Sequence, residues 1–169
     1  MRRRADARSL AQQAFALRER SPGSRLQLRA GKLLWTGDLR PNSLSRDYTV
    51  QIRYRTGGYP QVRVQRPQLD RRPGESLPHV YRDGTLCLYR EGEWSSAMLI
   101  ADSIVPWASE WLLFYEIWLP TGEWHGGGDW PPPRTSDSQG ERPPSAEREG
   151  AAQDEHHNMA YQTPTPADA

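Results

Sequence analysis

The residue best suited to covalent chemistry in this chain is Cys87, the only cysteine among 169 residues. A single cysteine has no partner for an internal disulfide, so it is either a small buried apolar residue or a reactive thiol. Pro78 and the pair Asp83-Gly84 precede it, and these residue types form turns. A turn packed beside the cysteine can hold backbone N–H groups near a reacting carbonyl.

Six segments with regular hydrophobic periodicity must position this cysteine. Residues 9–20 and 103–119 have apolar residues at helical spacing, and the second segment carries an aromatic stripe. Strands are predicted at residues 26–29, 32–36, 47–55 and 61–65, joined by short turns. This order predicts an α+β fold in which an antiparallel meander has one solvated face and packs against helices. Residues 77–93 have little regular period and are predicted to form a long ordered loop, which in a compact domain usually carries function.

The composition changes sharply near residue 130. All seven Trp residues precede Pro131, whereas residues 131–169 are rich in Pro, Ser, Glu, Gln and Ala. Such a segment buries too little apolar area to offset its ordering entropy. We therefore expect a flexible N-terminus at 1–8, one folded domain at 9–130 and a disordered tail at 131–169. The tail holds three Arg and seven acidic residues, so the folded part has a net charge of about +5.

Four short motifs surround the cysteine. Leu77-Pro78-His79 ends eight positions before Cys87, Gly84 precedes Leu86-Cys87-Leu88, Trp94-Ser95-Ser96-Ala97 follows, and Tyr59-Pro60 stands before Val62. Together with the order helix, meander, cysteine loop and helix, these motifs resemble the ubiquitin-conjugating enzyme (UBC) family. In that family a His-Pro-Asn tripeptide lies at the position of residues 77–79, and the resemblance covers about residues 9–130.

The Trp-rich segment of residues 107–124 departs from the eukaryotic pattern of the family. It resembles bacterial standalone UBC-like proteins found in short type II CBASS antiphage defence operons. In that group the conjugating enzyme acts on the C-terminus of its cognate cGAS-like nucleotidyltransferase. The resemblance therefore implies this nucleotidyltransferase as the partner and a lysine of a target protein as a possible acceptor.

The resemblance implies that Cys87 carries an acyl group as a thioester, which suits a thiolate because it is a strong nucleophile. His79 replaces the family's Asn, which orders the active-site loop and helps to stabilise the oxyanion. An imidazole can donate a hydrogen bond to an oxyanion, accept a proton as a base, or hold the loop in place, and all three roles stay open.

Six further residues are expected to support the active-site loop: Pro78, Tyr81, Asp83, Gly84, Tyr89 and Trp94. Pro78 sets the direction of the loop, and Asp83 is expected to begin a turn with Gly84 rather than to deprotonate an amine. Tyr89 covers the thioester or belongs to the core, and Trp94 packs under the loop. On the second helix, Glu116 is predicted to pair with an Arg of the core rather than to face the cleft.

Several function classes are disfavoured. No phosphate-binding or dinucleotide Gly motif is present, so the acyl group must arrive already activated, and no cofactor is expected. His156-His157 has no spaced ligand partners, so no metal is expected. No apolar run reaches the roughly 20 residues that span a bilayer, and no signal peptide is recognised, which predicts a cytoplasmic location and a reduced thiol.

Three other functions compete with the acyl transferase. The alternative retained is a catalytically inactive UBC-like module that binds and regulates the same partner. Nucleic-acid binding is not expected, because Arg residues that alternate with apolar ones are typical of a solvated sheet face and no recognised motif is present. A cysteine hydrolase of another fold is disfavoured because the other histidines, His125, His156 and His157, lie at or beyond the end of the predicted fold.

Overall fold

The computed structural model describes residues 6–127, which contain two helices and four strands. In chain order these are α1 (Leu10–Arg20), β1 (Arg25–Arg29), β2 (Lys32–Leu39), β3 (Tyr48–Arg55), β4 (Gln61–Arg66) and α2 (Ile104–Thr121). The predicted α+β class is confirmed. The predictions of a domain boundary at residue 130 and of a disordered tail at 131–169 lie outside the described residues, as do residues 1–5 of the predicted flexible N-terminus.

The four strands form one antiparallel sheet in the order β1-β2-β3-β4, which confirms the predicted meander. Val50, Ile52 and Tyr54 of β3 are buried, whereas Arg53 and Arg55, which alternate with them, are exposed. The second strand is longer than expected, because Gly37, Asp38 and Leu39 continue the ladder by pairing with the start of β3. Gly37 is suited to this place, since a Cβ there would lie 2.3 Å from the ring of Trp35.

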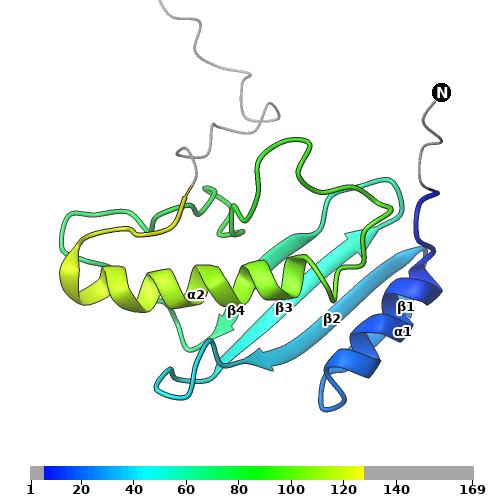
Figure 1. Ribbon diagram of the computed structural model, residues 1–169, viewed down its shortest axis with the longest axis horizontal. Coiled ribbons are helices and arrows are strands. Elements are labelled where there is room, and N and C mark those ends of the chain that lie inside the picture. Colours follow the sequence, from blue (N-terminus) through cyan, green and yellow to red (C-terminus); the bar gives the residue numbers. More distant parts are fainter. Residues whose placement is uncertain (1–5, 128–169) are drawn as a thin grey trace, which may run out of the picture. The chain divides into compact units, whose positions relative to one another are not determined.

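Both helices pack on the same face of the sheet, with α2 along it and α1 beside β1 and β2 (Figure 1). The side chain of Ser9 caps α1 by accepting a hydrogen bond from the N–H of Gln12, as expected for a capping box. The buried side chain of Gln13 bonds to Met98 O at 2.8 Å and to the N–H of Ile100 at 2.8 Å. These bonds join α1 to the segment that leads into α2.

The aromatic stripe of α2 belongs to the core, as its helical spacing predicted. Ile104, Trp111, Tyr115 and Trp118 are buried, while Trp107 is half-buried. The helix ends at Thr121 and is capped by Gly122, whose φ of 79° is the left-handed conformation that glycine adopts without strain. This end directs the following residues, 123–127, back past the helix.

The partner predicted for Glu116 is wrong. Its carboxylate accepts hydrogen bonds from the hydroxyl of Ser45 at 2.5 Å, the N–H of Arg46 at 3.2 Å and the hydroxyl of Tyr48 at 2.9 Å. No arginine side chain pairs with it within the described residues. Glu116 therefore fastens the β2–β3 connection to α2 through a backbone amide and two hydroxyls, which sequence spacing does not reveal.

Replacing Tyr48 by Phe is expected to lower the free energy of unfolding at neutral pH by about 1.5 kcal/mol, because the bond to a charged acceptor is lost. Burial, reinforced by the bond to Glu116, raises the pKa of Tyr48 in the folded protein. Its stabilising contribution is therefore complete below the unfolded value near 10 and is lost as the pH rises above it. Urea unfolding at pH 7.5 and pH 10.5 should show the difference between the two proteins shrinking; a constant difference would contradict this account.

Candidate active site

The candidate site lies on the long connection between β4 and α2, and the predicted loop at residues 77–93 forms part of it (Figure 1). The loop folds back on itself through an antiparallel bridge between Val80 and Leu86. The N–H of Tyr81 donates to Thr85 O at 2.8 Å, and the N–H of Leu86 donates to Val62 O of β4 at 2.9 Å. The segment just before the cysteine is thus anchored to the sheet.

Asp83 and Gly84 form the tip of this folded segment. The N–H of Gly84 donates to Tyr81 O at 2.8 Å, and Gly84 has a φ of 79°, which this turn requires. Asp83 Oδ1 accepts from both the N–H and the hydroxyl of the buried Thr85, at 3.0 and 2.6 Å. The other carboxylate oxygen lies 3.9 Å from Arg63 of β4. These contacts place Asp83 within its own turn.

Cys87 and His79 are adjacent across the folded segment. The N–H of Cys87 donates to His79 O at 2.8 Å, and the Cys87 side chain is half-buried. His79 is buried and has a φ of 51°. Among residues other than glycine, Asn, Asp and His are enriched in this left-handed conformation. A histidine in place of the family's asparagine therefore preserves a residue type suited to this backbone geometry.

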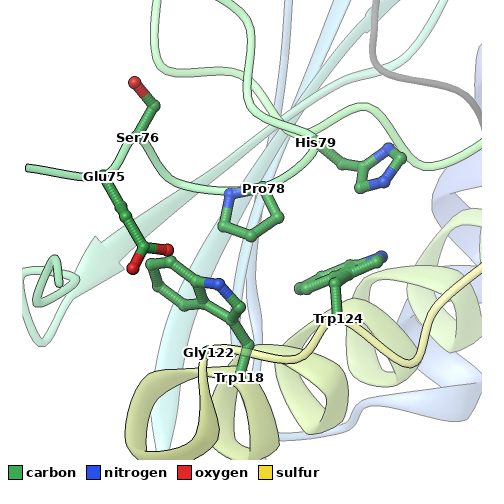
Figure 2. Close-up of a pocket in the computed structure, with 7 residues that line it drawn as sticks. All are labelled: Glu75, Ser76, Pro78, His79, Trp118, Gly122 and Trp124. Carbon is green, nitrogen blue, oxygen red and sulfur yellow. The ribbon is translucent and has the colours of Figure 1, made fainter.

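The imidazole of His79 stacks on the indole of Trp124, with ring centroids 5.2 Å apart and planes inclined by 30°. Both residues line an open groove of about 520 Å³ between the loop and the exit of α2. Figure 2 shows Trp118 and Trp124 on one side, Pro78 and His79 across from them, and the carboxylate of Glu75 beside Trp118. The groove offers an apolar contact surface next to the cysteine loop.

An aromatic cluster packs against the loop after Cys87. Trp94 is buried, and its ring centroid lies 5.6 Å from that of Tyr54 and 6.4 Å from that of Tyr89. Tyr89 also packs on Trp107 of α2, at 5.5 Å. Tyr89 thus belongs to the packing layer that joins the loop to α2, while the nearby Tyr81 is half-buried.

The structure brings the expected residues into one continuous loop. Pro78 and His79 enter it, Tyr81, Asp83 and Gly84 form its turn, Cys87 follows the turn, and Tyr89 and Trp94 pack behind it. Trp118 and Trp124 of the groove were not predicted as site residues. The sequence could have indicated them, because they flank the Thr121-Gly122 helix stop. One indole therefore lies on the last turn of the helix and the other just after it.

Within residues 6–127, no group of three or more His, Cys, Asp or Glu side chains is placed to hold a metal ion. The same residues include no helix with the length and apolarity needed to cross a membrane.

An antiparallel meander covered on one face by two helices, with a cysteine loop between the last strand and the second helix, defines a protein of UBC-like fold. A model of the type II CBASS E2 protein family matches residues 13–131, most of the chain. The chain therefore belongs to this family, and it is an E2-like protein of CBASS defence. A search of the curated proteins gave no match.

Proposed function

We propose that the protein is a cysteine-dependent acyl transferase that forms a thioester between Cys87 and the C-terminus of a partner protein. The thiolate attacks the partner's C-terminal carbonyl, which arrives activated as an acyl adenylate or as a thioester on an activating enzyme. The new thioester bond forms as AMP or the enzyme's thiol leaves. An amine then attacks the thioester, the amide bond forms, and the Cys87 thiolate leaves while the amine releases a proton.

The observation that supports this function best is the setting of Cys87. The residue is half-buried, its N–H is bonded to His79 O at 2.8 Å, and the preceding residue is bonded to β4. A nucleophile on a segment anchored in this way is held in a defined position, which is what a positioned attack on a carbonyl needs. Membership of an E2-like family supports the same assignment.

We propose that the main role of His79 is to hold Cys87 in this position. Its carbonyl accepts the bond from Cys87, its backbone has the left-handed φ, and its ring is stacked on Trp124. Donation by the imidazole to the tetrahedral oxyanion, or proton acceptance by it, would add to this positioning role. Pro78, Tyr81, Asp83, Gly84, Tyr89 and Trp94 are proposed as supporting residues.

The proposed partner is the cognate cGAS-like nucleotidyltransferase of the same operon, and the proposed acceptor is a lysine of a target protein or another amine. The protein is proposed to act in the bacterial cytoplasm, where a thiol stays reduced. Lys32 of β2 is the only lysine of the chain, so the chain itself offers few amines that could trap the acyl group.

Intact-protein mass spectrometry after co-expression of the whole operon tests the proposal. We expect an adduct on this chain whose added mass equals the nucleotidyltransferase minus one water, and we expect reductant to remove it because thiols cleave thioesters. The matched control is a nucleotidyltransferase that lacks its C-terminal residue, with which no adduct should form.

The same experiment separates the rival function. A stable complex without any covalent adduct, formed equally well by the nucleotidyltransferase with and without its last residue, would support the inactive binding module. In that case Cys87 would be a packing residue, and the proposed transferase would be wrong.

A further inference from the structure

The face of the sheet away from the helices gathers positive charge from all four strands. The strands contain seven basic residues and a single acidic one, Asp38. The alternation of the strands and their register place the basic side chains on the face opposite the buried residues. This basic face consists of Arg25, Arg29, Lys32, Arg53, Arg55, Arg63 and Arg66.

The register brings several of these cations next to one another. In the strand register, Lys32 lies opposite Arg29 of β1 on one side and opposite Arg55 of β3 on the other. Three positive side chains therefore stand in one row across β1, β2 and β3. Arg53 and Arg55 follow each other on β3, about 7 Å apart. Like charges directly opposite each other destabilise a sheet, so an anion bound here would offset a cost built into the fold.

The sparsity of carboxylates, rather than ion pairing alone, distinguishes this face, since Arg8, Arg18 and Arg71 elsewhere in residues 6–127 also form no ion pair. Away from the sheet face, Arg20, Arg40, Arg46 and Arg72 each pair with a carboxylate. On the basic face, Arg63 alone has such a partner, Asp83 at 3.9 Å. Within residues 6–127, the other six cations of the face form no ion pair. An ordinary solvated face would be expected to show the mixed signs found elsewhere on the molecule.

The other side chains of the face indicate what kind of anion fits. Gln27, Gln61 and Thr36 supply neutral hydrogen-bonding groups between the cations, and Leu34 is the only apolar residue of the face. Gln51 accepts a hydrogen bond from Arg53 at 2.9 Å, and Thr49 donates one at 2.6 Å to Asp38, the one carboxylate of the face. A stable protein–protein interface has an apolar centre, which this face lacks. It also lacks aromatic residues on which single-stranded bases could stack. Arg, Lys, Gln and Thr are the residue types that contact phosphate oxygens.

We propose that this basic face binds the phosphate backbone of a nucleic-acid duplex without reading its sequence. The contacts are charge-assisted bonds from Arg and Lys to phosphates, supported by the amides and hydroxyls of the face. This proposal does not rest on the Cys87 chemistry, although one cation of the face, Arg63, lies 3.9 Å from Asp83 of the cysteine loop. It revises the expectation from the sequence that nucleic acid is not a partner.

Fluorescence anisotropy of a labelled mixed-sequence DNA duplex of about 24 base pairs, with the full-length protein, tests the proposal. The face variant combines Lys32→Gln, Arg53→Gln and Arg55→Gln. The matched control combines Arg18→Gln, Arg20→Gln and Arg71→Gln, which removes the same charge away from the sheet face. At about 100 mM salt we expect the face variant to bind at least about 10-fold more weakly than wild type, and the control to differ by less than about 3-fold.

Salt titration gives a second readout. Loss of three phosphate contacts should reduce the slope of log affinity against log salt by about 2.7, and the control should keep the wild-type slope. Equal losses in both variants would overturn the proposal, because net charge rather than the basic face would then set the affinity. Unchanged binding in both variants would also overturn it and would place the contacts elsewhere, such as at Arg2-Arg3-Arg4. Displacement of the duplex by polyglutamate at equal charge concentration would overturn it in favour of an acidic polypeptide.

Folding is checked by circular dichroism. If the face variant does not fold, Arg25→Gln with Arg29→Gln on the edge strand β1 replaces it, and the same comparison is made. A folded edge-strand variant that binds the duplex as tightly as wild type would then overturn the proposal.

Discussion

Replacement of Cys87 by Ser is expected to reduce acyl transfer by about 10³-fold or more while leaving the fold intact. A serine hydroxyl is scarcely ionised near neutral pH, so it is a far weaker nucleophile than a thiolate. The bond from residue 87 to His79 O uses the backbone N–H and is kept in the variant. Because the side chain is only half-buried, the free energy of unfolding should change by less than about 1 kcal/mol.

Single-turnover transfer assays, with urea unfolding of the same preparations, measure this prediction. Any ester formed by Cys87→Ser should resist reductant, and Cys87→Ala should form no adduct. An adduct that persists in Cys87→Ala would place the acyl group on another residue. Leu88→Met, a conservative change at the next position, is the control and should transfer at nearly the wild-type rate.

Substitutions at His79 should have the next largest effect on the transfer rate. The loss should depend on whether the new residue tolerates the left-handed backbone and whether its side chain carries an N–H donor. His79→Ala removes the imidazole and forces a residue with a poor tolerance of φ 51° into that conformation, at a cost of about 1–2 kcal/mol. Its transfer rate should fall by about 10²-fold to 10³-fold, the loss typical of a missing oxyanion donor. His79→Asn keeps both the backbone tolerance and an N–H donor, so its rate should stay within about 10-fold of wild type.

His79→Gly separates the roles that the sequence leaves open. Glycine adopts the left-handed φ without strain but has no side chain. Wild-type transfer in His79→Gly would show that the backbone position is sufficient, whereas loss in Gly with retention in Asn would identify a donor. Loss in both Gly and Asn, with a changed pH–rate profile, would identify a base and contradict the expected order.

Trp124 provides a control for the orientation of the ring. Trp124→Phe keeps an aromatic surface under the imidazole and should transfer nearly as wild type, while Trp124→Ala removes the surface 5.2 Å from it. A rate that is unchanged in Trp124→Ala would show that stacking does not position His79.

The secondary structure was predictable because its determinants are local. The alternation of residues 47–55 and the aromatic stripe of residues 103–119 predicted β3 and α2 to within about two residues at each end. The larger miss, at the end of β2, involved Gly37 and Asp38, which have low strand propensity. Pairing with β3 extends the strand there, and the partner lies about a dozen residues further along the chain.

The candidate site was predictable in part. The spacing of Cys87, Gly84 and His79, together with the motifs on either side, led to the loop and to the family that the match over residues 13–131 shows. The partners of Glu116 could not be predicted, because they are a backbone amide and two hydroxyls on the β2–β3 connection and the start of β3, some 70 residues away. The groove beside His79 could not be predicted from the sequence either, because its walls come from the loop, from the end of α2 and from the residues after α2.

Periodicity and residue type act within a few positions, so the class of fold, the order of its elements and the single cysteine around which a thioester function is proposed can all be read from the amino-acid order. The left-handed conformation of His79, its stacking on Trp124 and the gathering of cations on one face follow only from the tertiary structure. Each of these depends on which residues distant in the chain become neighbours, and strand register and helix packing set those contacts.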